Sequence, residues 1–422
     1  MGNTPNIRFK GFTDDWEQRK LGDNIIEYTE KTTINNQYPV LTSSRKGIFF
    51  QTEYYDGNQV ASADNTGYNI VPYGYFTYRH MSDDEIFHFN INDIAENGIV
   101  STLYPVFTTD ENLDSRYLQY QLNYGREFAK YAILQKQGGS RTYMYLNKLK
   151  NLYLIVPKSV NEQKRISGYF MQLDNLITLH QRKCDETKKL KKFMLQKMFP
   201  KKDEKKPEIR FADFTDDWEQ RKLGWLVDND VIEAPKDGNH GEKHPTSDEY
   251  VEEGIPFLMA SDIRNGRVDL ENCKYITKER AEQLDKGFAR EGDVLLTHKA
   301  TIGEVAILEG LQEEYAMLTP QVTYYRILDN KRLSQKYLYA VFHSESFQNE
   351  MQTKAAQSTR PYIGISAQQN LTISLPCSTE EQQRIGEYFA SLDTLITLHQ
   401  RKCDEIKEIK KFMLQNMFPQ KG

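Results

Sequence analysis

The sequence predicts an α/β protein in which two α/β domains are separated by two long antiparallel coiled-coil helices, arranged as an internal repeat with pseudo-twofold symmetry. Two repeated blocks carry this prediction. Residues 7–22 return at 209–224 with 14 of 16 positions identical, and residues 173–202 return at 392–421 with 24 of 30 identical. The second block has the apolar spacing of a coiled coil, whereas the segments between the blocks resemble short strands and turns.

The two copies keep their ends and differ in their middles. The offset between the copies is 202 residues at the first block and 219 at the second, so the intervening segments differ in length by 17 residues. Beyond scattered matches these segments hardly resemble one another. A period of this length also excludes solenoids, whose repeats have roughly 20–50 residues. We therefore expect a common structural frame that presents two different recognition surfaces.

The repeated C-terminal block predicts a long helix in each copy. Apolar or compatible residues follow mostly alternating steps of four and three, as in a coiled-coil seam: Ile166, Phe170, Leu173, Ile177, His180, Cys184, Thr187, Met194 and Met198. Pro200 ends the first helix and Pro419 the second. A lone helix with this much exposed apolar surface would aggregate, so we expect it to pair with its own copy. Cys184 and Cys403 are expected as small core residues, and Lys191 interrupts the seam.

The segments between the repeated blocks predict α/β domains. Aromatic or β-branched runs at 68–78 and 292–298 are cut by Gly, Pro or Asp and indicate strands and turns, while 113–131 and 333–352 have helical patterns. The predicted organisation is a first domain at 1–157, a long helix at 158–200, a charged linker at 201–208, a second domain at 209–376 and a second long helix at 377–422.

Composition indicates a cytoplasmic protein. Charged residues make up 27% of the chain, the net charge is −5, and no apolar run approaches the roughly 18 residues of a membrane span. The N-terminus lacks the basic-then-apolar order of a signal peptide. The four cysteines contain no CxxC pair, which argues against a zinc ribbon or a disulfide framework. The acidic net charge does not exclude DNA binding, because binding depends on where the charges lie.

Catalytic motifs are missing from the sequence. We find no phosphate loop, no GxGxxG that opens a helix, no HExxH and no loop typical of amino-methylating enzymes. Two histidines flank Glu242, at 240 and 244, but that segment is too rich in Gly and Pro to hold a helical metal site. The acidic string at 14–17 is better explained by a helix cap at Thr13 or Asp14 with Trp16 in the core. We expect no catalytic residue and no metal site.

Binding residues are better represented. Each middle ends in a small, polar, basic and aromatic segment, at 137–143 in the first copy and 357–362 in the second. Hydroxyls and glycines suit contact with phosphates, and arginine can bind phosphate or the edge of guanine with two hydrogen bonds. An ordinary surface loop is the alternative, but recurrence at the same place favours DNA. The DNA-binding candidates are Ser43, Ser44, Arg45, Lys46, Tyr78, Arg79, Gly139, Ser140, Arg141, Tyr143, Ser261, Arg264, Asn265, His298, Lys299, Thr301, Ser358, Thr359, Arg360 and Tyr362.

The whole layout resembles the specificity subunits of type I restriction-modification systems. The resemblance rests on FTDDWEQRKLG, which occurs twice, on Gly292-Asp293-Val294-Leu295-Leu296 followed by Thr301-Ile302-Gly303, and on the Glu-Gln-x-x-Arg-Ile strings that open each long helix. It implies that each α/β domain is a target-recognition domain for one half of a bipartite, asymmetric site in double-stranded DNA, and that the helices set the spacer. The first domain lacks the Gly-Asp-Val-Leu-Leu string.

The resemblance also implies partners that carry the catalytic residues. Two methyltransferase (modification) subunits would dock on the repeated helices and modify adenine with S-adenosylmethionine. Restriction (translocase) subunits that hydrolyse ATP with Mg²⁺ would join them, so this chain needs no cofactor of its own. The alternative is a coiled-coil scaffold that binds proteins and reads no DNA, which the net acidic charge would suit. Salt dependence separates the two, because DNA binding weakens by orders of magnitude between about 50 and 200 mM salt.

Overall fold

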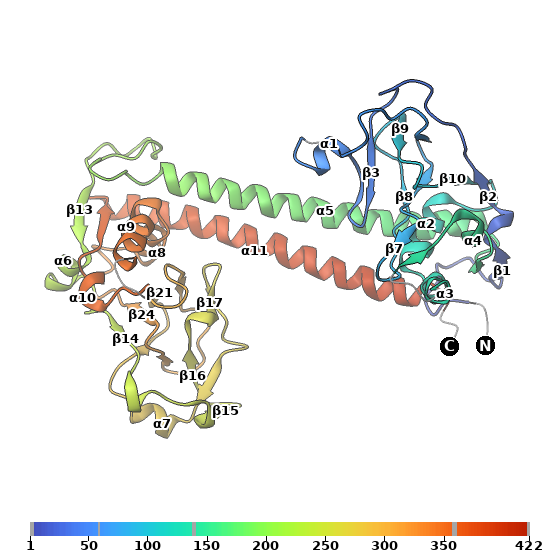
Figure 1. The fold of residues 1–422 in the computed structure, drawn as a ribbon. Helices are drawn as coiled ribbons and strands as arrows, with labels where there is room; N and C mark the ends of the chain where they lie inside the picture. Colours follow the sequence, from blue (N-terminus) through green and yellow to red (C-terminus); the bar gives the residue numbers. More distant parts are fainter. Residues whose placement is uncertain (1–3, 58–59, 137–140, 357–360, 420–422) are drawn as a thin grey trace. The chain divides into compact units, whose positions relative to one another are not determined.

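The computed structural model describes residues 4–57, 60–136, 141–356 and 361–419 (Figure 1). The chain forms two compact units, of which unit 1 comprises Met1–Leu179 with Lys402–Gly422 and unit 2 comprises His180–Arg401. The domain boundaries expected from the sequence stay predictions, because these units are defined by compactness and not by the repeat. No helix among the described residues is long and apolar enough to cross a membrane.

Unit 1 contains twelve strands: β1 Glu17–Lys20, β2 Ile25–Glu27, β3 Leu41–Ser44, β4 Gly47–Phe50, β5 Asn69–Pro72, β6 Phe76–Thr77, β7 Met81–Ser82, β8 Asn90–Ile91, β9 Asn97–Val100, β10 Val106–Thr109, β11 Thr142–Tyr143 and β12 Tyr153–Val156 among its described residues. The helices that begin in it are α1 Gln51–Tyr54, α2 Ser115–Tyr124, α3 Arg126–Leu134, α4 Leu146–Leu149 and the long α5 Val160–Lys197. Its core is rich in aromatic side chains, among them Phe76, Tyr78, Phe89, Phe107 and Tyr117.

Unit 2 contains thirteen strands in the part of it that the structure describes: β13 Glu219–Lys222, β14 Lys236–Asp237, β15 Tyr250–Val251, β16 Ile255–Leu258, β17 Ile263–Arg264, β18 Arg267–Val268, β19 Lys274–Ile276, β20 Phe288–Ala289, β21 Val294–Thr297, β22 Val305–Ile307, β23 Ala316–Leu318, β24 Val322–Tyr325 and β25 Thr372–Leu375. The α-helices that begin in it are α6 Leu223–Asp228, α7 Lys278–Glu282, α8 Gln335–Phe342, α9 Glu345–Ala355, α10 Ile365–Gln368 and the long α11 Thr379–Asn416.

The two diverged middles share one sheet topology. Unit 1 has a four-stranded sheet in the order β2-β10-β6-β8, and unit 2 has one in the order β14-β24-β21-β22. In both, the strand that follows a turn with one left-handed glycine, Gly74 or Gly292, pairs antiparallel with the strand that precedes the domain's helices, Phe76 opposite Phe107 and Leu295 opposite Tyr324. The predicted α/β class is therefore confirmed in both domains, including the first, which lacks the Gly-Asp-Val-Leu-Leu string.

The first repeated block forms a strand, not a helix. β1 pairs antiparallel with β12, with Glu17 opposite Val156, and β13 pairs with β25, with Glu219 opposite Leu375, so the two copies share one register. The helix cap expected at Thr13 or Asp14 was therefore wrong, because the residues after it extend to pair with a strand beyond the domain's middle. Trp16 is 1% exposed, as expected for a core residue.

A buried carboxylate joins this block to the start of each long helix. Glu162 in the first turn of α5 accepts hydrogen bonds from Arg8 (Nε–Oε1, 2.6 Å; Nη2–Oε2, 2.8 Å) and from Trp16 Nε1 (3.2 Å). Glu381 in α11 accepts the same set from Arg210 (2.6 and 2.9 Å) and Trp218 (3.3 Å). Both glutamates are 1% exposed. Hydrogen bonding to Glu162 raises the pKa of Arg8, so Arg8 stays charged.

The glutamine after each buried glutamate ties the helix to the domain. Gln163 accepts from the backbone N–H of Asp114, the cap of α2, and donates to the Pro157 carbonyl (2.8 and 2.9 Å). Gln382 accepts from the N–H of Ser334 before α8 and donates to the Pro376 carbonyl (3.0 and 3.1 Å). The Glu-Gln pair thus fixes the long helix to two parts of the domain at once.

The end of each long helix packs into a domain core. Met198 and Phe199 lie in the core of unit 2, where the Phe199 ring contacts Trp218, and Met417 and Phe418 lie in the core of unit 1. The backbone N–H of Ile209 donates to the Lys197 carbonyl (2.9 Å), and that of Ile7 donates to the Asn416 carbonyl (3.0 Å). The first repeated block of each copy therefore contacts the end of the long helix of the other copy.

The long helices pair antiparallel, as predicted. In unit 1 the Cys403 thiol approaches the Ile177 carbonyl (3.8 Å), and in unit 2 the Cys184 thiol approaches the Ile396 carbonyl (3.8 Å). Both cysteines are 0% exposed, which confirms them as small core residues.

Lys191, which interrupts the coiled-coil seam, and its counterpart Lys410 in the second copy each form an ion pair with an aspartate. Lys191 pairs with Asp393 (2.6 Å), which also accepts from Tyr339 (2.9 Å). Lys410 pairs with Asp174 (2.6 Å), which accepts from Tyr120 (2.7 Å).

The two predicted helical stretches are each broken into two helices. Gly125 has an extended backbone between α2 and α3, and a Cβ there would lie 2.3 Å from the Gln121 carbonyl oxygen. In unit 2 the Ser344 hydroxyl accepts from Phe347 N–H and so starts α9 afresh. The pattern of apolar residues continues through both breaks, which is why periodicity alone missed them.

Replacing Glu381 by Gln should destabilise the protein by about 3 kcal/mol, because Arg210 would keep its charge in a mostly buried position without a carboxylate. Chemical denaturation of the variant and of the wild type measures this difference. The matched control is Glu380→Gln, since Glu380 is the exposed neighbour that pairs with Arg384 (2.8 Å) and should contribute less than about 1 kcal/mol. Equal losses from the two variants would contradict the assigned role of Glu381.

Candidate nucleic-acid interface

In unit 1 one edge of the domain gathers most of the predicted contact residues. The chain leaves β6 through Tyr78, Arg79 and His80 and enters β7, which pairs antiparallel with β11 so that Met81 lies opposite Tyr143. The Met144 N–H donates to the His80 carbonyl (2.7 Å). This register places the Arg-Thr-Tyr segment opposite the residues that follow His80, although the two are far apart in the sequence.

The β3–β4 hairpin adds a third segment to this edge. The Ser43 hydroxyl donates to the Thr77 carbonyl (3.0 Å) and accepts from Asn90 Nδ2 (2.9 Å), which anchors the hairpin to β6 and β8. At its tip Arg45 pairs with Asp84 (2.5 Å), while Arg141 pairs with the neighbouring Asp83 (2.8 Å). We call Arg45, Arg79, Arg141 and Tyr143 the first-domain edge.

Aromatic rings extend this edge. His80 stacks on Tyr145 with ring centroids 5.0 Å apart, and Tyr143 stacks on Tyr145 at 5.8 Å. Both tyrosines are exposed, and such rings provide flat apolar surface next to the cationic groups. The edge therefore combines guanidinium groups with exposed aromatic surface.

Unit 2 has the same construction at the end of β21. His298 and Lys299 follow the strand, Lys299 forms a β-bridge with Tyr362, and the Ile363 N–H donates to the His298 carbonyl (3.2 Å). The rings of His298 and Tyr362 lie 5.6 Å apart. His298 and Tyr362 therefore correspond to His80 and Tyr143, and we call Lys299, Thr301 and Tyr362 the second-domain edge.

A hollow adjoins Lys299. It has a volume of about 380 Å³, and its lining includes His240, His244, Thr319 and Gln321. Thr319 is 4% exposed, and its hydroxyl has no hydrogen-bond partner among the described residues. The neighbouring His298 is buried, and burial lowers its pKa to about 4, so it is neutral near pH 7 and does not attract phosphate.

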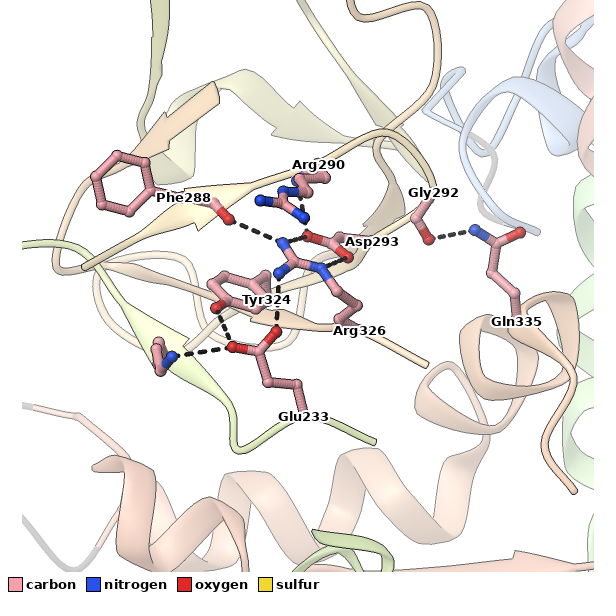
Figure 2. A network of polar contacts seen from close by, with 9 residues as sticks. Glu233, Phe288, Arg290, Gly292, Asp293, Tyr324, Arg326 and Gln335 are labelled. Atoms are coloured by element: carbon pink, nitrogen blue, oxygen red, sulfur yellow. Dashed lines mark hydrogen bonds and ion pairs between the residues drawn. The ribbon is translucent and has the colours of Figure 1, made fainter. Parts of the chain in front are cut away.

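The Gly-Asp-Val-Leu-Leu string acts as a structural anchor at the opposite end of β21 (Figure 2). Arg326 donates to both carboxylate oxygens of Asp293 (3.0 and 2.7 Å), to Glu233 (2.8 Å) and to the Phe288 carbonyl (2.9 Å). The Arg290 N–H also donates to Asp293 (2.7 Å). Burial raises the pKa of the Asp293 carboxyl, and Arg326 opposes this rise. This network fixes where β21 begins and therefore where Lys299 emerges.

Comparison with known proteins connects this architecture to a family. Residues 13–189 and 215–408 each match the type I restriction modification DNA specificity domain. Together these two matches cover most of the chain. The protein belongs to the type I restriction-modification DNA specificity family.

Individual relatives agree over nearly the full length. The chain is 25% identical to the type I restriction enzyme MjaVIII specificity subunit of Methanocaldococcus jannaschii, over 94% of this chain and 91% of that one. It is 23% identical to the putative MjaX specificity subunit of the same organism, with the same coverage. The crystal structure of a type I restriction-modification S subunit from M. genitalium has the same fold, with a TM-score of 0.63 at 13% identity, covering 99% of this chain and all of that one.

As a DNA specificity subunit, this protein must expose its contact residues, and three predicted ones are not exposed. Tyr78 and His298 are each 0% exposed, and Ser43 is 7% exposed with its hydroxyl used inside the domain. Their side chains are used inside the domain, so the structure gives no support for direct DNA contact by these three residues, and that contact stays a prediction. The Tyr78 hydroxyl donates to the Met144 carbonyl (2.9 Å) and so holds β11 in place.

The remaining predictions fall into two groups, those that are exposed or half-exposed and those outside the described residues. The exposed or half-exposed candidates are Ser44, Arg45, Lys46, Arg79, Arg141, Tyr143, Ser261, Arg264, Asn265, Lys299, Thr301 and Tyr362. Gly139, Ser140, Ser358, Thr359 and Arg360 lie outside the described residues. Ser261, Arg264 and Asn265 lie on or just before the β17–β18 hairpin, which packs beside β22 and, within the described residues, shares no hydrogen bond or ion pair with the second-domain edge. For all of these, DNA contact stays a prediction.

Sequence reasoning missed two features of the interface. Asp83 and Asp84 lie among the arginines of the first-domain edge, and the only sequence signal was their closeness to Arg79. The hollow beside Lys299 is built from segments around 240, 250 and 320, which no local motif connects. Both features depend on which residues lie opposite one another in paired strands, and the sequence pattern of such short strands is too brief to predict that register.

Tyr78→Phe and Arg79→Ala should separate support from contact at adjacent positions. The first should cost about 1 kcal/mol of stability through the lost buried hydrogen bond and leave DNA affinity unchanged. The second should leave stability unchanged and reduce the slope of log affinity against log salt by about 1 if Arg79 contacts a phosphate. Thermal unfolding and DNA titrations at several salt concentrations measure both. A loss of DNA affinity in the well-folded Tyr78 variant would overturn this division.

Proposed function

We propose that each α/β domain reads one half of a bipartite, asymmetric DNA site, and that the two long helices set the spacer between the halves. The observation that carries the proposal is the duplicated edge, which stands at the end of the same sheet strand in two domains of different sequence. His80 and Tyr143 occupy the positions of His298 and Tyr362, whereas the exposed cations around them differ. One construction with two sets of exposed side chains suits two different half-sites.

The chain acts in this proposal as a non-catalytic subunit in the cytoplasm. It directs two methyltransferase subunits, which modify adenine with S-adenosylmethionine, and restriction (translocase) subunits, which hydrolyse ATP with Mg²⁺. The repeated helices support this assignment, because both copies expose apolar side chains such as Leu190, Phe193, Ile409 and Phe412 on surfaces of closely similar sequence. Two copies of one partner fit two copies of one surface. A coiled-coil scaffold without DNA reading is not favoured.

Contact with DNA involves the exposed cations of both edges in this proposal. Arg79 of the first-domain edge and Lys299 of the second have exposed side chains that can reach the phosphate backbone or a base edge, and Arg45 and Arg141 can do so by exchanging their exposed aspartate partners for DNA. Arginine offers planar, paired donors that match guanine or phosphate, and lysine a single mobile charge. Tyr143 and Tyr362 would pack against sugars or bases at the same edges.

Exchange of residues 20–155 for the corresponding segment of a relative tests the proposal. The methylated motif, read by sequencing modified bases in a host that carries the partner subunits, should change in one half only. A hybrid in which both halves change, or neither, would show that the domains do not read separately. Retained modification activity in the hybrid confirms that the frame and its partners still assemble.

Arg141→Ala should weaken binding to the cognate site by about 1–3 kcal/mol if Arg141 reads a base, with relaxed preference in one half-site. A titration with fluorescently labelled duplexes altered in one half at a time gives both quantities. The control is Arg116→Ala, which removes a comparable surface ion pair with Asp93 (2.8 Å) at the far end of β8. Equal effects from the two variants would show that Arg141 contributes only net charge. Arg360 carries the same expectation for the other half-site.

A further inference from the structure

Three consecutive acidic residues face three cations on the first domain. Asp83 pairs with Arg141 (2.8 Å), Asp84 pairs with Arg45 (2.5 Å), and Glu85 pairs with Lys136. We call Asp83, Asp84 and Glu85 the acidic loop. Two of its three partners were predicted from the sequence as DNA contacts, so the loop occupies the groups that phosphates would otherwise attract.

The backbone fixes this arrangement. Ser82 lies opposite Thr142 in the β7–β11 pair, so Asp83 and Arg141 are cross-strand neighbours in register. The Asp84 carboxylate also accepts from the Ser82 hydroxyl (2.7 Å) and the Ile86 N–H (3.3 Å), and Glu85 has a left-handed backbone (φ 61°) that closes the turn. Hydrogen bonds from Arg45 and Ser82 hold the pKa of Asp84 well below its usual range, so Asp84 is negatively charged near neutral pH.

Each ion pair is exposed and individually weak, so the arginines remain available to DNA. Side-chain exposure is 50% for Arg141 and 57% for Arg45, and exposed pairs exchange partners readily in water. Three negative charges at the interface nevertheless repel any approaching phosphate. A duplex gains net attraction only when further contacts, such as bonds to base edges, compensate for the displaced carboxylates.

The second domain provides an internal comparison. Lys299 occupies the position that Met81 has in the first domain, because each forms the backbone pair with the interface tyrosine. The residues that follow, Ala300–Gly303, contain no acid, and Lys299 has no ion-pair partner among the described residues. The acidic loop therefore belongs to the first domain alone and is not part of the arrangement that both domains share.

We propose that the acidic loop is a specificity determinant of the first domain, which holds Arg45 and Arg141 away from the phosphates of non-cognate DNA. This inference rests on the proposed function, since it assigns the loop to the edge that reads one half-site. Cognate DNA displaces the carboxylates because base contacts add to the phosphate contacts, whereas other sequences meet only the repulsion. The loop would thus reduce non-specific binding more than specific binding.

Asp83→Asn and Asp84→Asn, each in the full chain, test the proposal. Affinities are measured at about 50 and 200 mM salt for three duplexes: the cognate site, one scrambled in the first half-site and one scrambled in the second. Each variant should bind the duplex scrambled in the first half about three- to tenfold more tightly than wild type does at the lower salt, with a steeper salt dependence. Affinity for the cognate duplex should change less, so discrimination in that half falls.

Asp93→Asn is the matched control. Asp93 is also partly exposed and paired with an arginine, but it follows β8 at the end remote from the acidic loop. The Asp93→Asn variant removes the same charge from the same domain, so an equal gain in its affinity for non-specific DNA would overturn the proposal. Thermal unfolding verifies that all variants fold.

Two further outcomes would also overturn the proposal. Unchanged affinity for scrambled DNA would show that the loop does not oppose phosphate contact. Loss of cognate affinity without any gain elsewhere would show that the aspartates accept hydrogen bonds from cytosine amino groups instead. If the wild type discriminates both half-sites and the variants behave like it, only this inference fails. A wild type that discriminates neither half-site would contradict the proposed function itself.

Discussion

The buried glutamate at the start of each long helix is the interaction on which the rest of the structure depends. Glu162 and Glu381 each receive a two-bond arginine and an indole N–H, and each lies in a first helical turn, where the helix dipole favours a negative charge. A buried ion pair of this kind adds little net stability compared with apolar packing. It specifies geometry instead, since only one approach of the first block to the helix satisfies all the donors.

That geometry fixes the positions of the first-domain edge and the second-domain edge. Once β1 has paired with β12 and the glutamine after each buried glutamate has bound the start of α2 or α8, both ends of each middle are anchored. The middle then only has to complete a four-stranded sheet of constant order. Its loops are free to vary in length and charge, which explains how segments that differ by 17 residues present the same histidine and tyrosine at the same edge.

The frame could be predicted from the sequence because duplication made it visible. The long helices, their antiparallel pairing, their cysteine seam and the buried tryptophan all followed from repeated residues or from periodicity. The β1 strand did not, since its partner lies more than 130 residues away and a Thr-Asp-Asp start looks locally like a helix cap. The breaks at Gly125 and Ser344 also escaped, because apolar spacing continues through them while the backbone does not.

The site was harder to predict, for a reason that Tyr78 and Arg79 illustrate. They are adjacent in the segment that follows β6 and both looked suitable for DNA, yet the Tyr78 side chain is buried and supports β11 from inside, whereas Arg79 is exposed. A sequence that gives a strand only two residues, as β6 and β7 have, hardly specifies which face is which. Charge poses the same difficulty. Arg45, Lys136 and Arg141 are distant in the sequence, and only register shows that consecutive acids neutralise all three. The net charge of −5 therefore does not argue against DNA recognition, because binding depends on where the charges lie and not on their sum.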